Sequence, residues 1–206
     1  MHVVFHVEEP SAEAALEELL PKILGSGATW KIHPYQGKRD LLAKLPFRLR
    51  SYVTWLPADW YIVVLIDEDR EDCLRLKAEL DQAALDAGLG VRGRNRGKER
   101  SRVITRIAVE ELEAWLLGDI EALVAAFPGV PRTLNEKRGY RDPDAVTGGT
   151  WEALERVLKH AGYFQSGLPK IEVARRVARE MEPSRNRSHS FQCFRDILLD
   201  LVGHSE

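Results

Sequence analysis

The chain has 206 residues, of which 44% are hydrophobic and 30% are charged, and its formal net charge is −2. This composition predicts one globular α/β domain, or one with an extension, and excludes a strongly basic field over the whole chain. The absence of a leader peptide and of any run of about 18 apolar residues indicates a cytoplasmic protein without a membrane partner, in which Cys73 and Cys193 stay reduced.

The first predicted strand covers residues 3–7 and ends in two adjacent carboxylates, Glu8 and Glu9. A helix follows from Pro10, with an apolar face at helical spacing until the glycines near residue 25. Glu13 lies one helical turn beyond Glu9, so it is able to face the same point. The alternative is a solvated first turn whose acids only complement the helix dipole.

The second predicted strand, residues 29–35, leads into a basic helix that Pro46 is expected to interrupt or restart. Aromatic side chains follow a run of basic ones in this region, a pattern that suits phosphate contacts and base stacking. An ordinary solvated helix face with aromatic residues in the core is the alternative. The side chains concerned are Lys38, Arg39, Lys44, Arg48, Arg50, Tyr52 and Trp55.

The central strand is the apolar run of residues 61–66, which stops at two carboxylates, Asp67 and Asp69. An uninterrupted, β-branched run of this length is typical of a parallel strand buried on both faces. Ligands of such sheets bind at the carboxyl ends of the strands. Two like charges there become tolerable around a divalent cation, and hard oxygen ligands favour Mg²⁺ or Mn²⁺. The alternative is that Asp67 caps the helix predicted over residues 73–85.

The most basic loop of the chain covers residues 91–102, with five arginines and one lysine against a single acid. It has too few apolar residues to join a core, and two glycines give it conformational freedom. We expect it to contact phosphates or to be mobile, with a merely solvated loop as the alternative. The predicted nucleic-acid-binding side chains of the whole chain are Lys38, Arg39, Arg94, Arg96, Lys98 and Arg100.

A fourth strand is predicted over residues 103–109, and it too is followed by acids, Glu110, Glu111 and Glu113. Three of the four predicted strands therefore end in carboxylates. Parallel strands place their carboxyl ends along one edge, so these groups are expected to converge. Because each like-charge neighbour pushes a carboxylate towards protonation, a bound metal would resolve the conflict.

No strand is predicted after residue 120. Helices are predicted near residues 120–127 and over residues 151–161, 170–181 and 191–202, and Thr150 is expected to cap the second of these. We therefore divide the chain into an α/β catalytic core, residues 1–119, and a helical extension packed on it, residues 120–206.

Several blocks of the sequence resemble a Toprim-like family of unknown function, and the likeness covers nearly the whole chain. The family is similar to the Toprim domains of OLD-type nucleases, topoisomerases and primases. The blocks are Val7-Glu-Glu-Pro-Ser-Ala-Glu13, Val64-Leu-Ile-Asp-Glu-Asp69, Ile107-Ala-Val-Glu-Glu-Leu-Glu-Ala-Trp-Leu-Leu-Gly-Asp119, Asp142-Pro-Asp-Ala, Gly148-Gly-Thr-Trp-Glu-Ala-Leu-Glu and Gly167-Leu-Pro-Lys-Ile-Glu-Val-Ala-Arg.

The resemblance implies a four-stranded parallel sheet that carries a metal-binding set of acids. Toprim motifs read Val-Glu-Gly, whereas this chain has Val-Glu-Glu, so two registers are open. Aligning the valine makes Glu8 the catalytic acid, whereas the Glu-x-x-x-Glu spacing of OLD nucleases selects Glu9 with Glu13, the register that we favour. A Glu-x-Glu block matches Glu111 and Glu113, and a downstream lysine of the OLD group corresponds to Lys170.

The resulting prediction is a Mg²⁺-dependent nuclease, the effector of a phage-defence system with an SMC- or ABC-like ATPase partner. The partner is implied by the resemblance alone, and a homo-oligomer is possible. One alternative is an inactive metal-binding module that docks the ATPase. The other is a nucleotide phosphotransfer or primase-like enzyme. The predicted catalytic residues are Glu9, Asp67, Asp69 and Lys170, and the predicted metal ligands are Glu8, Glu9, Glu13, Asp67, Asp69, Glu111 and Glu113.

Overall fold

The centre of the molecule is a parallel β-sheet. A computed structural model describes residues 1–69, 71–93 and 101–203 of the chain. The sheet has four strands in the order β2-β1-β3-β4, and every neighbouring pair is parallel. Its strands are β1 (His2–Val7), β2 (Thr29–Pro34), β3 (Trp60–Asp67) and β4 (Val103–Ala108). The predicted α/β fold with a four-stranded parallel sheet is therefore confirmed.

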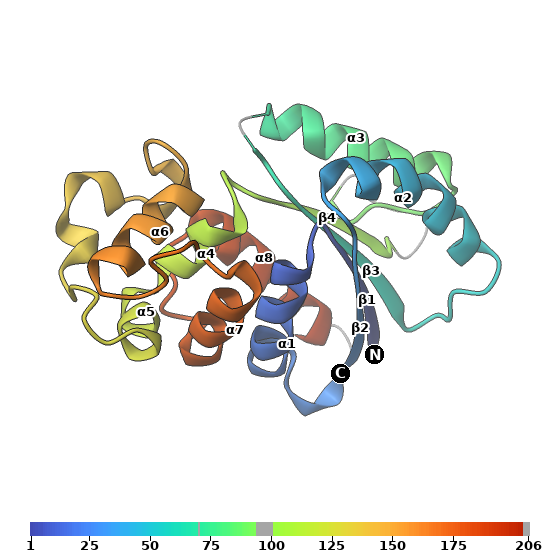
Figure 1. The fold of residues 1–206 in the computed structure, drawn as a ribbon. Helices are drawn as coiled ribbons and strands as arrows, with labels where there is room; N and C mark the ends of the chain where they lie inside the picture. Colours follow the sequence, from blue (N-terminus) through green and yellow to red (C-terminus); the bar gives the residue numbers. More distant parts are fainter. Residues whose placement is uncertain (70, 94–100, 204–206) are drawn as a thin grey trace.

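Helices cover both faces of this sheet (Figure 1). One face carries α2 (Lys38–Val53) and α3 (Cys73–Asp86), and the other carries α1 (Pro10–Leu24) and α8 (His189–Gly203). Side chains of successive residues in β3 point to opposite faces of the sheet and pack in the two apolar cores there. Val64 packs with α2 and α3, whereas Val63 belongs to the larger core beneath α1 and α8. Burial on both sides explains why the apolar run of β3 is uninterrupted.

The remaining helices extend the layer that contains α1. They are α4 (Leu112–Gly118), α5 (Ile120–Ala126), α6 (Thr150–His160) and α7 (Lys170–Glu180), with short 3₁₀ turns between α5 and α6. No strand occurs in residues 120–203, as predicted. One apolar core on this side of the sheet includes residues from before and after position 119. The division of the chain at that position stays a prediction.

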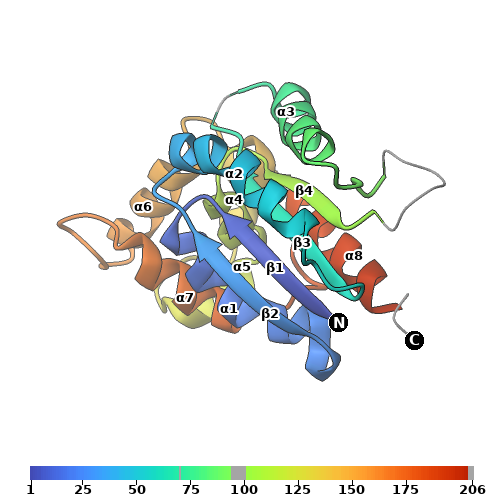
Figure 2. The same ribbon diagram turned by 90° about the vertical axis from the view of Figure 1, so that its right-hand side faces the viewer.

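Helices α1 and α7 pack side by side and run parallel (Figure 2). At their carboxyl ends, the Lys22 ammonium donates hydrogen bonds to the carbonyls of Ala178, Arg179 and Met181, at 3.1, 2.5 and 2.8 Å. A cation is favourable there because the last carbonyls of a helix have no partner within the helix. The same register brings the first residues of both helices, Pro10 and Lys170, to the carboxyl edge of the sheet.

Helix α2 continues through Pro46, so the predicted interruption is wrong. A proline removes one backbone hydrogen bond and strains the preceding turn. The buried row of Leu41, Leu45 and Leu49 holds α2 against the sheet on both sides of the proline, and such packing supplies most of the stability of a helix in a protein. In the described part of the chain, no helix is long and apolar enough to cross a membrane.

Candidate functional site

Carboxylates from three neighbouring strands meet at the carboxyl edge of the sheet. Strand register pairs Val7 with Leu65 and Asp67 with Ala108, so the residues that follow β1 and β4 flank the end of β3. The Glu8 carboxylate accepts a hydrogen bond from the backbone N–H of Asp67 at 3.1 Å. The structure thus brings together acids that lie about a hundred positions apart in the sequence.

The pKa of the Asp67 carboxyl is raised by its surroundings at this edge. Burial raises the pKa of its carboxyl well above the usual range, and the negative charges of Glu113, Glu8, Asp69 and Glu9 raise it further. Four carboxylates that act on one carboxyl cannot all remain ionised without a compensating cation. The alternative role of Asp67 as a helix cap is wrong, since the N-cap of α3 is the acid five residues later, which accepts from a backbone N–H of the first turn.

Glu113 is the most deeply buried of these acids, with 3% of its surface exposed. Its Oε2 atom is buried without a hydrogen-bond partner. Burial raises the pKa of the Glu113 carboxyl to about 7; Lys170 opposes the rise, and Glu111 and Glu9 add to it. An orphaned carboxylate oxygen inside a protein is costly, so this position favours a bound cation or a proton.

Lys170 is the cation closest to Glu113. Its Nζ lies 3.7 Å from Glu113 Oε1 and 3.5 Å from Glu9 Oε1, at the beginning of α7. The ammonium also stands 4.7 Å from the centre of the Trp151 ring. Burial alone would lower the pKa of Lys170, but Glu113, Glu9 and the other nearby carboxylates together raise it. The lysine is therefore held in its charged form beside the acids.

The loops after β3 and β4 are tied to each other by their backbones. Glu68 N–H donates to the carbonyl of Ala108 at 2.9 Å, and Asp69 N–H donates to the carbonyl of Glu110 at 3.0 Å. The Glu68 side chain accepts from the N–H of Glu110 at 3.0 Å. Asp69 and Glu110 both adopt positive φ angles, 50° and 60°. Strained residues of this kind concentrate at functional sites.

A second lysine neutralises the other side of the edge. Lys38 Nζ lies 3.1 Å from Asp69 Oδ2 and 3.0 Å from Glu71 Oε1, and it donates to the carbonyl of Glu68. Burial alone would lower the pKa of Lys38, and the two carboxylates reverse this to a net rise. Lys38 was predicted from the sequence as a phosphate contact. The structure places it beside Asp69, a predicted metal ligand. We call this carboxyl edge of the sheet, with Glu8, Glu9, Asp67, Asp69 and Glu113, the acid edge.

Glu111 joins the acid edge to the helical extension. Its Oε2 atom accepts hydrogen bonds from the hydroxyl of Thr150 and from the backbone N–H of Trp151, both at 2.8 Å. Thr150 was expected to cap α6, and this prediction is wrong. It is the first helical residue, and its hydroxyl donates to Glu111, while Gly149 occupies the N-cap position.

The remaining predicted residues are less closely connected to this edge. Glu13 lies in the first turn of α1, where its backbone N–H donates to the carbonyl of Glu9 at 3.4 Å. No side-chain hydrogen bond or ion pair of the described residues joins its carboxylate to the other acids. Arg39 lies on the exposed side of α2. The four predicted phosphate contacts of the basic loop fall outside the described residues: Arg94, Arg96, Lys98 and Arg100.

Comparison with protein families assigns the chain to a family. The model of a family described as a domain of unknown function, DUF4276, matches residues 7–201. The chain belongs to this family. The predicted membership in a family of unknown function is therefore confirmed. No functionally curated protein matches the sequence.

Two solved structures are similar to the DUF4276 chain, both of the C-terminal region of the OLD protein from Xanthomonas campestris pv. campestris. The structure phased with iodine is 14% identical, covers 98% of this chain and 96% of its own, and has a TM-score of 0.47. The structure phased with platinum is 17% identical, covers 99% and 97%, and has a TM-score of 0.39.

The acids of the DUF4276 chain fit a hard divalent cation in their chemistry. Every donor is a carboxylate oxygen, one of these oxygens is buried without a partner, and burial opposes the ionised form of Asp67. As the side chains lie, no three His, Cys, Asp or Glu side chains of the described ranges form a cluster that could hold a metal ion. Binding would therefore require side-chain rotation, and Lys170 would have to yield part of its position between Glu9 and Glu113.

Several participants of the edge were not predicted from the sequence. Ser11 donates to the Glu9 carboxylate at 2.6 Å, Glu68 ties the two loops together, and Trp151 lies against Lys170. Glu68 stands within the Asp-Glu-Asp motif, so its position was a usable signal. Trp151 carries no such signal, because its contact depends on how α6 meets α7.

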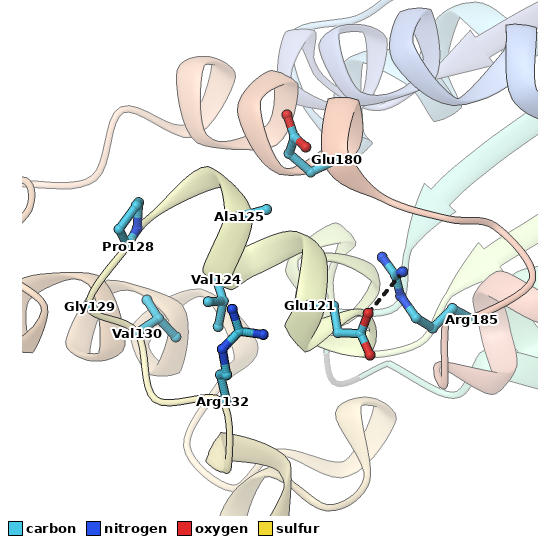
Figure 3. Close-up of a pocket in the computed structure, with 9 residues that line it drawn as sticks. All are labelled: Glu121, Val124, Ala125, Pro128, Gly129, Val130, Arg132, Glu180 and Arg185. Carbon is cyan, nitrogen blue, oxygen red and sulfur yellow. Dashed lines mark ion pairs between the residues drawn. The ribbon is translucent and has the colours of Figure 1, made fainter.

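A hollow of about 680 Å³ lies elsewhere, between α5, the segment after it and the end of α7 (Figure 3). Its lining has mixed charge, since Arg132 and Arg185 face it together with Glu121 and Glu180. Arg185 is engaged by Glu121 at 3.1 Å, the ion pair that is drawn dashed in Figure 3. None of the predicted catalytic or metal-binding residues lines this hollow.

Proposed function

We propose that this DUF4276 protein is a metal-dependent nuclease that hydrolyses phosphodiester bonds at the carboxyl edge of its sheet. The observation that carries the proposal is the set of acids around Asp67. Glu8, Glu9, Asp69 and Glu113 raise its pKa together, on a parallel sheet whose ligands are expected at this edge. Hard oxygen donors of this kind suit Mg²⁺ or Mn²⁺.

In the proposed enzyme, Asp67, Glu9 and Glu113 would hold the ion, helped by Glu8 or Asp69. A bound Mg²⁺ would supply a more acidic water molecule and would offset the negative charge of the phosphate. Glu111 serves mainly to position this group of acids, since its carboxylate is occupied by Thr150 and Trp151. Glu13 is left as an outer acid of the site.

The lysines of the edge contribute positive charge to the substrate complex. Lys170 is held in its charged form by Glu9 and Glu113, and its ammonium has three N–H donors while its two ion pairs are long, at 3.5 and 3.7 Å. We infer that it contacts a non-bridging oxygen of the scissile phosphate, where charge increases in the transition state. Lys38 places a second positive charge at this edge, beside Asp69.

The resemblance of the motifs to Toprim domains supports this reading, because the same acids match the three signature blocks. It is also the basis for proposing an SMC- or ABC-like ATPase partner and a role in phage defence. The near-neutral charge of the chain favours a partner that supplies part of the nucleic-acid affinity.

The proposal is tested by a cleavage assay with plasmid, single-stranded DNA and transfer RNA, each with Mg²⁺, Mn²⁺ or EDTA. Asp67→Ala is expected to lower the cleavage rate by about 100-fold or more, because it removes a central charge of the site. Asp86→Ala is the matched control, since Asp86 is an exposed acid at the end of α3. Cleavage that resists EDTA, or that persists in Asp67→Ala, would exclude this site.

An inactive chain would direct the same experiment to a second stage. The proposed SMC- or ABC-like ATPase partner would be added, and metal-dependent cleavage in its presence would support a partner-activated nuclease. A stable complex without turnover would favour a docking module. Growth of a nucleic-acid product on addition of nucleoside triphosphates would favour a primase-like enzyme.

A further inference from the structure

The outer face of α2 carries a large aromatic ring in solvent. Phe47 is 75% exposed, and Trp55, just after the helix, is 52% exposed. Single exposed apolar residues are common on protein surfaces and need no explanation by themselves. The charge around Phe47 is what makes it informative.

Helix α2 has a strong local excess of positive charge. It contains five basic residues and a single acid, although the whole chain has a net charge of −2. Asp40 is paired with Lys44 at 2.6 Å. Among the described residues, no ion pair involves Arg39 or Arg50, and both are exposed. Arg39 and Arg50 are therefore not neutralised by neighbouring acids of the described chain, whereas Lys44 is paired with Asp40.

The ring and the cations share one side of the helix. Lys44 and Arg50 lie three residues before and after Phe47, a spacing that places all three on neighbouring positions of the same face. A ring flanked by cations matches a flexible polyanion with aromatic groups, because base faces stack on the ring while phosphates meet the charges. A base-paired duplex would leave the ring without an accessible base face.

We propose that the outer face of α2 binds single-stranded nucleic acid, with Phe47 stacked on a base and Lys44 and Arg50 in contact with phosphates. The inference deepens the proposed nuclease function by naming its substrate as single-stranded, and it rests on that function for its biological meaning. Neither the ring nor its flanking cations belong to the acid edge.

The helix also connects this face to the acid edge. It begins at Lys38, whose ammonium lies 3.1 Å from Asp69. From Arg39 to Arg50 the axial distance is about 16 Å at 1.5 Å per residue. A stacked strand with about 3.4 Å between phosphates would place four or five of them along that distance. A strand bound on α2 would therefore reach the carboxylates with one end.

Binding is measured by the fluorescence anisotropy of a labelled oligothymidine in EDTA, so that no cleavage interferes. Phe47→Ala is expected to weaken binding by roughly 5- to 100-fold, the range for one base–aromatic stack, whereas Phe47→Trp keeps it. Leu74→Ala is the matched control, because Leu74 is 80% exposed on α3 and has no ring. Arg50→Gln should reduce the dependence of log K on log salt by about 0.7.

Three results would overturn the inference. The first is an unchanged affinity in Phe47→Ala, which would assign the ring to a protein partner. The second is equal or tighter binding of a duplex of the same length. The third is no binding of oligothymidine by the wild-type protein at low salt.

The two proposals can fail separately. If binding depends on Phe47 but the protein cleaves nothing with Mg²⁺ or Mn²⁺, the proposed binding surface on α2 is supported and the proposed nuclease activity is refuted. If cleavage requires Asp67 but is unchanged in Phe47→Ala, the nuclease activity is supported and the binding surface on α2 is refuted.

Discussion

Replacing Glu113 with glutamine is expected to stabilise the metal-free protein at high pH. Burial raises the pKa of the Glu113 carboxyl from 4.5 to about 7. A carboxyl whose pKa is higher in the folded state binds more protons when folded, so its contribution favours folding below pH 4.5. That contribution is lost as the pH rises from about 4.5 to about 7. Above this window, the folded protein carries the full cost of the buried charge.

The expected magnitude follows from the pKa difference. A difference of about 2.5 pH units corresponds to roughly 3 kcal/mol of unfolding free energy. The glutamine amide would place a buried N–H group near an oxygen position that has no partner, which costs about 1 kcal/mol. The net gain of Glu113→Gln at pH 8 is therefore about 2 kcal/mol. For a domain of this size it raises Tm by about 4–8 °C.

The assay is urea unfolding in EDTA at pH 5 and pH 8, followed by circular dichroism. Glu79→Gln is the matched control, because Glu79 is exposed on α3 and undergoes the same chemical change. Glu113→Gln should gain stability over the wild type mainly at pH 8, and Glu79→Gln at neither pH. A stability difference that is the same at both pH values would refute the assignment of a buried, reluctantly ionised carboxyl to Glu113.

Three further predictions concern the same edge and its supports. Saturating Mg²⁺ should raise the Tm of the wild type but not of Asp67→Asn in a thermal-shift titration, with a gain of about 2.7 kcal/mol at a hundred times Kd. Lys170→Met should lower metal-dependent cleavage by about 100-fold or more in the plasmid assay, while Lys170→Arg retains part of it. Gly118→Ala should lower the unfolding free energy in urea by about 2 kcal/mol or more, because a Cβ there would collide with the buried Asn186 side chain. Equal Tm shifts, unchanged cleavage or unchanged unfolding would contradict these predictions in turn.

Much of the architecture could be predicted from local patterns. The apolar run before Asp67 indicated a strand buried on both faces, and the helical spacing in α1, α3 and α7 set their bounds to within a few residues. These patterns are reliable because burial on a strand or helix imposes a fixed period on the sequence. The same reasoning placed acids after three strands, and the parallel order of the sheet brings them to one edge.

Details that depend on competing contacts could not be predicted in this way. Pro46 is a local signal for a helix break, but packing of α2 on the sheet overrides it. The sequence predicts Thr150 as a helix cap, yet its hydroxyl donates a hydrogen bond to Glu111, which is distant in the sequence. A hydroxyl or carboxylate can satisfy either a local or a distant partner, and the sequence does not rank the two.

The sequence by itself determined the sheet, most of the helices and the position of Asp67 at the carboxyl end of the central strand, because these follow from periodicity and from the parallel arrangement of strands. Only the tertiary structure decided which cation faces which acid. Lys170 reaches Glu9 and Glu113 because α7 packs parallel to α1, and Lys38 reaches Asp69 because α2 begins beside β3. The physical reason is that charge–charge energies depend on distances between side chains, and packing fixes those distances only once the helices have docked.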